Sequence, residues 1–159
     1  MSDVICGIDP GFSGGVAFIF PDGRAEVHDM PCFDLDGRRE IDVRGLYRLV
    51  FERRPGLSAL ERNSARRGQG MGSTWRFAEG SGAARAVLEV ISDRVMAPTP
   101  AAWKASLGLG SDKLEALQMA RETFPDLARD RLSRKRDDGR AEALLIAEFA
   151  RRSIKTEAA

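Results

Sequence analysis

The chain has 159 residues, of which 43% are hydrophobic, and a formal net charge of +1. This length and composition predict one domain with a single buried core, and the near-neutral charge excludes a domain that binds nucleic acid through overall basicity alone. Because no stretch approaches the roughly 20 apolar residues of a membrane span and the first residues lack the basic start of a secretory signal, we expect a soluble cytoplasmic protein without membrane contact, whose tail from about residue 154 is flexible.

The first thirty residues predict three antiparallel strands. Apolar residues dominate 4–8 and 16–20, and residues 24–30 roughly alternate between polar and apolar side chains. The first run is apolar on both faces, which is typical of a central strand, and it ends on Asp9 just before Pro10. Asp9 therefore either opens a turn or places a carboxylate at the end of a central strand, which is a natural position for chemistry.

The next segment predicts a helix and a second strand that ends on an acid. Residues 31–40 are expected to form an irregular connection, and apolar residues recur at helical spacing over 43–51. A short apolar run then covers 57–60 and is followed directly by Glu61. An apolar strand that finishes on a carboxylate therefore occurs twice in the chain.

Residues 62–73 are polar, basic and rich in glycine, so we expect a mobile loop there. A helix is predicted over 74–91. The small and apolar residues on its expected inward side are Gly80, Ala83, Val87, Val90 and Ile91. Near the start of this helix, Trp75 and Phe77 are expected to pack in the core rather than to stack on nucleic-acid bases.

The remaining elements complete an α/β domain. A last strand is expected at 95–97, followed by helices over 101–107 and 111–124 and by a final helix from residue 139 onward. Three antiparallel strands, followed by helix, strand, helix, strand and terminal helices, predict a mixed five-stranded sheet covered by helices on both faces.

Two acids near the start of the final helix join the two strand-end acids as candidate site residues. Asp138 and Glu142 are four residues apart and so only about 40° apart around a helix, whereas Asp137 diverges from Glu142 by about 140°. Asp137, and partly Asp138, also fit an alternative role as helix N-terminal caps. The acids that we expect to meet are Asp9, Glu61, Asp138 and Glu142.

Carboxylates gathered without histidine or cysteine form a hard oxygen site that suits Mg²⁺ or Mn²⁺ rather than zinc. Two such ions about 4 Å apart can activate a water molecule and stabilise the leaving oxygen in phosphodiester hydrolysis. The residues alone leave two interpretations open. One is a nuclease with two Mg²⁺ ions per active site, which Mn²⁺ could replace, and the other is an ordinary α/β domain with acids at the ends of its elements.

Four short motifs stand in a characteristic order at residues 7–15, 57–61, 68–77 and 141–147, and they read GIDPGFSGG, LSALE, GQGMGSTWRF and AEALLIA. Together they resemble the RuvC family of Holliday junction resolvases, especially its branch found in phages and prophages. The resemblance covers nearly the whole chain. It implies a ribonuclease-H-like fold, a homodimer that binds a four-way DNA junction, and metal-dependent nicking of two strands symmetrically across it.

The resemblance also assigns the acids. The first, second and last acids of the family fall on Asp9, Glu61 and Glu142. The family's third acid commonly lies three residues before the last, but that position is Gly139 here. We therefore assign the third acid to Asp138, one residue earlier, with Asp137 as the alternative.

Two lysines and a set of further polar residues are expected to contact DNA. Lys104 and Lys113 match the family's basic residues near the scissile phosphate, where an ammonium group can hold the phosphate or stabilise developing negative charge. Arginine side chains in the glycine-rich loop can bind phosphates through paired hydrogen bonds. The expected DNA-binding residues are Arg62, Arg66, Arg67, Gln69, Lys104, Lys113 and Arg136.

Several alternatives stay open at this point. The nuclease could act mainly on flaps or forks, because substrate choice depends on how a dimer spaces its two sites. The chain could also be a non-catalytic module of the same fold that binds branched DNA. Sugar-kinase and actin-like ATPase domains begin with a similar strand and turn, but they need two related domains to enclose the nucleotide, so we expect no nucleotide cofactor. In a homodimer, the small-residue face of the helix over 74–91 is the expected interface, although the same face could instead cover the sheet.

Overall fold

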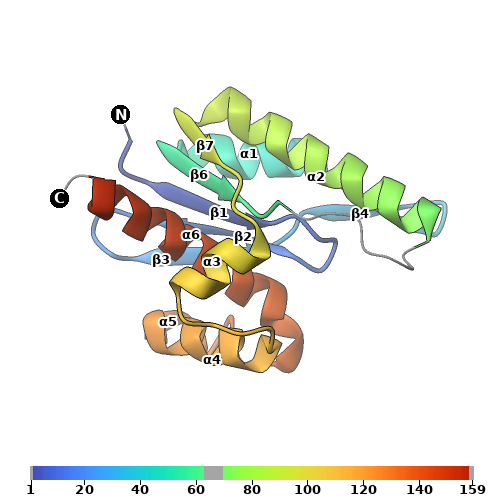
Figure 1. Ribbon diagram of the computed structural model, residues 1–159. Coiled ribbons are helices and arrows are strands. Elements are labelled where there is room, and N and C mark those ends of the chain that lie inside the picture. Colours follow the sequence, from blue (N-terminus) through green and yellow to red (C-terminus); the bar gives the residue numbers. More distant parts are fainter. Residues whose placement is uncertain (1, 63–69, 158–159) are drawn as a thin grey trace.

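A mixed five-stranded sheet forms the centre of the molecule, and helices pack on both of its faces (Figure 1). The computed structural model describes residues 2–62 and 70–157. The strands are β1 (Ile5–Asp9), β2 (Gly15–Ile19), β3 (Ala25–Asp29), β6 (Leu57–Leu60) and β7 (Arg94–Met96). Their order is β3-β2-β1-β6-β7, and β1 runs antiparallel to β2 and parallel to β6. The predicted mixed five-stranded sheet is thereby confirmed.

The side chains of β1 divide between two buried clusters, one on each face of the sheet. Ile5 belongs to the cluster beneath the C-terminal helices, whereas Cys6 and Ile8 belong to the cluster on the opposite face. On β2, Ala17 and Phe18 divide in the same way. This alternation follows from the two-residue repeat of a strand, and it explains why the first run of the sequence is apolar at nearly every position.

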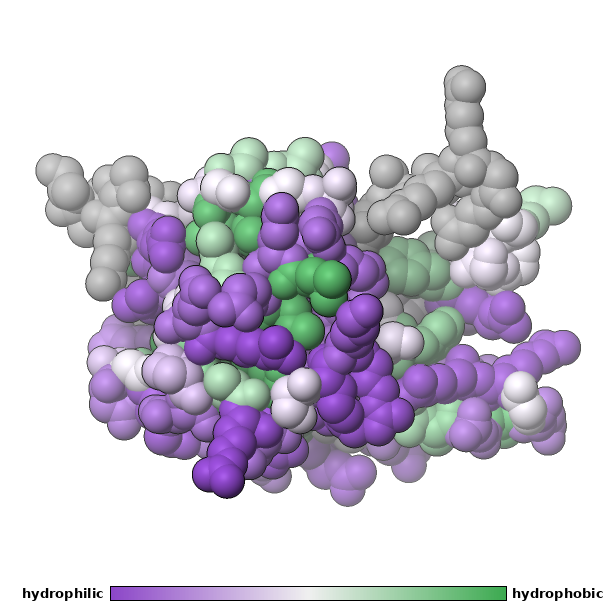
Figure 2. Space-filling model, turned by 90° about the horizontal axis from the view of Figure 1, so that it is seen from below, coloured by the Kyte–Doolittle hydropathy of each residue, from purple (hydrophilic) through white to green (hydrophobic). Residues whose placement is uncertain are grey.

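The helices form two layers. One face of the sheet carries α1 (Val43–Arg53) and α2 (Met71–Ile91). The elements on the other side are α3 (Pro100–Ser106), α4 (Lys113–Thr123), α5 (Pro125–Ala128), the 3₁₀ helix η1 (Lys135–Asp137) and α6 (Asp138–Glu157). Seen from below, the surface on the side of α4 and α5 is mostly hydrophilic, as befits an outermost layer (Figure 2). A helix with the length and apolar composition of a membrane span is absent from the described ranges.

Helix α6 lies directly on the backbone of β1 and of the β1–β2 turn, because glycine occupies the points of contact. A Cβ atom on Gly7 would collide with the carbonyl oxygen of Ala143 and the backbone nitrogen of Ala147. A Cβ atom on Gly139 would collide with the carbonyl oxygen of Ser13. The start of α6 is thus held close to the end of β1, where Asp9 lies.

The irregular connection predicted over residues 31–40 is instead a β-hairpin. It consists of β4 (Cys32–Leu35) paired antiparallel with β5 (Arg38–Ile41). The turn between them contains Asp36 and Gly37, which have left-handed φ angles of 50° and 74°. An Asp-Gly pair is a preferred two-residue hairpin turn, so the signal for this hairpin was present in the sequence.

Helix α2 confirms the predicted element and part of its predicted inward side, namely Gly80 and Val87. It begins at Met71 rather than at residue 74, and its first turns extend past the five-stranded sheet, beside β4 (Figure 1). The buried residues of α2 are Gly80, Ala84, Val87 and Leu88. Val90 is 77% exposed and Trp75 is 71% exposed, so the predicted inward positions of these two side chains are wrong. For Trp75 the physical reason is that the first turns of α2 extend past the five-stranded sheet (Figure 1), whereas Val90 lies in the last turn and lines a surface groove with Tyr47 and Phe51.

The small-residue face of α2 is turned toward the protein. A Cβ atom on Gly80 would lie 2.9 Å from the Cδ1 atom of Ile41, so the helix backbone packs there directly on the side chain of this β5 residue. This face is consequently occupied within the chain. Around Gly80 this face therefore packs within the chain, which is the alternative considered for it.

Candidate active site

Two of the predicted acids meet at one edge of the sheet. Asp9 is the last residue of β1, and Glu61 directly follows β6. These parallel strands are neighbours, with Ile8 opposite Leu60, and the backbone N–H of Glu61 donates to the carbonyl oxygen of Ile8 at 3.0 Å. Because the carboxyl ends of parallel strands meet at the same edge, the two carboxylates come from adjacent positions. Their convergence confirms the spatial arrangement that the repeated strand-then-acid pattern predicted.

The charge of Asp9 is strongly influenced by the other acids. The pKa of Asp9 is raised to about 7, first by burial and then by the negative charges of Glu142 and Glu61. A hydrogen bond from the backbone N–H of Gly11 to Oδ1, at 3.3 Å, and the positive charge of Lys113 partly offset this effect. The acids are therefore close enough to repel one another, which favours the binding of a cation.

Each acid from α6 is held by a lysine from a different helix. Lys104 on α3 donates from Nζ to Oε1 of Glu142 at 2.7 Å. Lys113, at the start of α4, contacts the carboxylate of Asp138 through its ammonium group, and this hydrogen bond raises the pKa of Lys113. Both lysines that were assigned from the sequence thus lie at the acids.

Asp138, and not Asp137, belongs to this site. The carboxylate of Asp137 is 3% exposed and accepts hydrogen bonds from the backbone N–H of Arg134 at 2.8 Å and from its guanidinium group. Burial alone would raise the pKa of Asp137, but the hydrogen bonds from Arg134 outweigh it, and the pKa is lowered. Asp137 therefore caps η1, which is the alternative role considered for it.

The position three residues before Glu142 cannot hold an acid with this backbone. Gly139 packs against Ser13 and Gly14 so closely that a Cβ atom would collide with both residues.

Trp103 is a site residue that the sequence analysis missed. Its side chain is 0% exposed, and its indole Nε1 donates to Oε2 of Glu61 at 2.7 Å. A buried tryptophan needs a hydrogen-bond partner for its N–H, and Trp103 precedes the assigned Lys104 directly. These two facts could have indicated that Trp103 belongs to the site, but they could not identify its partner, because Glu61 lies 42 residues earlier in the chain.

The donor set fits Mg²⁺ or Mn²⁺, although the side chains do not yet form a ligand shell. In the part of the chain that the structure describes, no three Asp, Glu, His or Cys side chains are arranged to hold one metal ion. Two ammonium groups and an indole N–H instead contact the carboxylates of Asp138, Glu142 and Glu61. The site consists of hard oxygen donors with excess negative charge around Asp9, which is the chemistry that these cations select.

The predicted DNA-binding residues divide into two groups. Arg66, Arg67 and Gln69 lie outside the described residues. Arg62 follows Glu61 and is exposed, and Arg136 is exposed on η1, two residues before Asp138. With Lys104 and Lys113, these arginines give the acid cluster basic neighbours on several elements.

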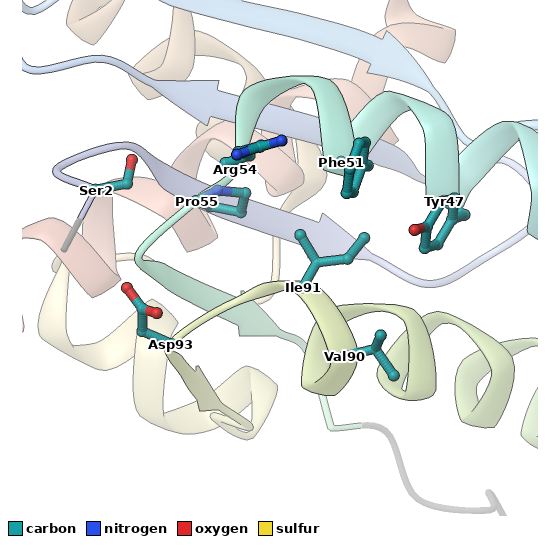
Figure 3. Close-up of a pocket in the computed structure, with 8 residues that line it drawn as sticks. All are labelled: Ser2, Tyr47, Phe51, Arg54, Pro55, Val90, Ile91 and Asp93. Atoms are coloured by element: carbon teal, nitrogen blue, oxygen red, sulfur yellow. The ribbon is translucent and has the colours of Figure 1, made fainter.

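A groove of about 470 Å³ lies at the other end of the molecule and is separate from the acids. Figure 3 shows it between the end of α1 and the end of α2, near the chain start. Its lining residues are Ser2, Tyr47, Phe51, Arg54, Pro55, Val90, Ile91 and Asp93. Because Ser2 precedes β1 and Asp9 ends it, the groove and the acid cluster lie at opposite ends of the central strand.

The fold is that of solved Holliday junction resolvases. A Thermus thermophilus RuvC in complex with Holliday junction substrate aligns with a TM-score of 0.63 and 18% identity, over 98% of this chain and 97% of that chain. Another Thermus thermophilus RuvC structure gives a TM-score of 0.59 and 20% identity, with coverages of 94% and 96%. The yeast mitochondrial Holliday junction resolvase Ydc2 gives 0.59 and 17%, over 95% of this chain and 78% of that chain.

No family model and no curated protein sequence matches the chain. The comparison of structures therefore carries the assignment, and at these identities it establishes the fold. The chain has the ribonuclease-H-like fold of RuvC, as the four sequence motifs implied. The narrower expectation of a phage or prophage branch stays a prediction.

Proposed function

We propose that this protein is a metal-dependent endonuclease that resolves Holliday junctions or related branched DNA. The observation that carries the proposal is the convergence of Asp9, Glu61, Asp138 and Glu142, with two lysines bonded to them, at the end of the central strand of a RuvC fold. The four acids would hold two Mg²⁺ ions, for which Mn²⁺ could substitute. Such ions supply an activated water and stabilise the leaving oxygen of a phosphodiester.

The residues around the acids have separate tasks in this proposal. Lys104 and Lys113 bind the α6 acids in the DNA-free protein, and either ammonium group can instead donate to the scissile phosphate, where it would stabilise developing negative charge. Arg62 and Arg136, both exposed beside the acids, would hold the flanking phosphates. The chain itself thus binds and orients the DNA, and it neutralises the reacting phosphate.

Symmetric nicking of two strands requires two active sites, so we also infer a homodimer. The resemblance to RuvC supports this inference. Sedimentation of a monomer at micromolar concentration, with junction cleavage unchanged, would contradict it.

The decisive experiment compares cleavage of a synthetic four-way junction, a fork, a flap and a plain duplex, each with Mg²⁺, with Mn²⁺ and with chelator. We expect the junction to be nicked fastest and only with metal. Asp9→Asn should lower the cleavage rate by about a thousandfold or more, because it removes a charged metal ligand, and should leave junction binding unchanged. Asp93→Asn, which removes an exposed carboxylate in the distant groove, is the matched control and should cleave normally.

A second candidate function is a non-catalytic module that binds branched DNA. It is favoured by one observation, namely that lysines already neutralise Asp138 and Glu142 in the described structure. This function predicts junction binding without metal and no nicking with either ion. Preferential cleavage of forks or flaps would instead retain the nuclease and change its substrate.

A further inference from the structure

Trp103 and Lys104, adjacent residues of the short helix α3, bind acids from two other elements. Trp103 donates its indole N–H to Glu61 after β6, and Lys104 donates to Glu142 on α6, both at 2.7 Å. The Lys104 ammonium also lies 5.1 Å from the centroid of the Trp103 ring. Two consecutive residues of α3 therefore contact two acids, Glu61 and Glu142, that are far apart in the sequence.

The Lys104–Glu142 hydrogen bond can be broken more easily than the Trp103–Glu61 hydrogen bond. The Lys104 side chain is flexible and charged, so a competing phosphate or cation can separate it from Glu142. The Trp103 ring is 0% exposed and is packed in the same buried cluster as Leu107 and Phe124. An indole N–H can only donate, and the ring cannot turn away without disturbing this cluster.

The Trp103 contact also fixes the orientation of the Glu61 carboxylate. Oε2 of Glu61 receives the indole hydrogen bond, and because the donor is rigid, the carboxylate plane is held in one orientation. A hydrogen bond between a neutral N–H and a buried carboxylate is also stronger than one between neutral partners. Glu61 would therefore keep its orientation when a cation binds.

We propose that Trp103 is a positioning residue that orients the Glu61 carboxylate for a divalent cation. This inference rests on the proposed function in one respect, namely that Glu61 is a metal ligand. Hydrogen bonds that orient metal ligands commonly contribute about 10- to 100-fold to metal affinity. Trp103 would act through Glu61 without touching the metal or the DNA.

The first test uses Trp103→Phe, which keeps an aromatic ring in the core and removes the N–H. We expect Mn²⁺ affinity, measured by calorimetry on the full chain, to fall about tenfold, with junction binding in chelator unchanged. Trp75→Phe is the matched control, since Trp75 is the other tryptophan and is 71% exposed, and its Mn²⁺ affinity should equal that of the unmodified protein. Equal Mn²⁺ affinity of the Trp103→Phe protein would overturn the proposal.

The second test needs no change at Trp103 and decides the matter if the Trp103→Phe protein fails to fold. In protein labelled with ¹⁵N-tryptophan, Trp75→Phe leaves a single indole N–H resonance, that of Trp103. We expect this resonance to exchange slowly with solvent, to shift upfield with Glu61→Gln and to move when Mg²⁺ is added. A resonance that responds neither to Glu61→Gln nor to Mg²⁺ would overturn the proposal.

The two tests separate this inference from the proposed function. If the indole resonance responds to Mg²⁺ but no DNA is cleaved under any condition, the nuclease assignment fails while the role of Trp103 stands. If junctions are cleaved but neither metal affinity nor the resonance depends on the Trp103 contact, the role of Trp103 fails while the nuclease assignment stands.

Discussion

Replacing Asp9 by asparagine should stabilise the metal-free protein, even though it should abolish activity. The pKa of Asp9 is raised from 3.8 to about 7 by burial and by the neighbouring acids Glu142 and Glu61. A raised pKa means that the folded protein binds the proton more tightly than the unfolded chain does, so the free energy of unfolding falls as pH rises from about 4 to about 7. At about 1.36 kcal/mol per pH unit, the full effect is about 4 kcal/mol above pH 7. The uncharged amide of the Asp9→Asn protein would carry no such dependence.

The assay is urea denaturation in chelator at about pH 8 and about pH 5. The Asp9→Asn protein should exceed the unmodified protein in free energy of unfolding by up to about 4 kcal/mol at the higher pH, and by less than half of that at the lower pH. Asp93→Asn, which removes an exposed carboxylate elsewhere, serves as the control. Added Mg²⁺ should stabilise the unmodified protein and not the variant, because the ion compensates the repelling charges. An equal stabilisation at both pH values, or none, would refute the argument that Asp9 is held in a repulsive site.

Two further predictions concern the position of α6. Gly139→Ala should lower the free energy of unfolding by about 1–3 kcal/mol, because the new Cβ atom would collide with the Ser13 carbonyl oxygen. Gly82→Ala is the control and should not lower it, since no described atom lies within 4 Å of its Cβ position. Thermal melting of both variants would show whether α6 lies as described. Asp29→Asn should weaken the paired 2.6 Å hydrogen bonds from Arg140. The Arg140 side chain is 11% exposed but that of Asp29 is 67% exposed, so solvent screens the pair and we expect a loss of stability of about 1 kcal/mol, together with a lower cleavage rate. Unchanged melting would mean that the pair does not anchor α6.

Much of the sheet was predictable because its central strands carry a strong signal. The runs that became β1, β2 and β6 are apolar at consecutive positions, which only a strand buried on both faces requires. The acids at two strand ends and on one face of α6 followed from the same local patterns. The hairpin β4–β5 was missed because its strands are short and largely exposed, so their sequence is too polar to suggest strands. The Asp-Gly turn between them was the one local feature that indicates a hairpin.

The inward side of α2 could not be derived from its own residues. The helix carries small and apolar residues around most of its circumference, so its periodicity does not decide which side meets the sheet. Packing on Ile41 decides it, and this residue belongs to the hairpin that the sequence analysis missed. Trp75 and Val90 lie on the sides of the helix that this packing leaves exposed.

The charged residues of the site could be predicted from the sequence, but the hydrogen bonds among its residues could not. Lys104 and Lys113 followed from the resemblance, and both lie on acids. The indole bond from Trp103 joins residues 42 positions apart on separate elements, and no local pattern contains it. The choice between Asp137 and Asp138 likewise depended on Arg134, which withdraws Asp137 into the η1 cap.

The direct contact of α6 with β1 makes the spacing of the acids a property of the backbone. Because Gly7 has no side chain, the distance between strand and helix is set there by the backbone of Ala143 and Ala147 and by the small Cβ atom of Ala147. The geometry of the acid site therefore depends on keeping a few positions, Gly7 and Gly139 among them, free of any side chain.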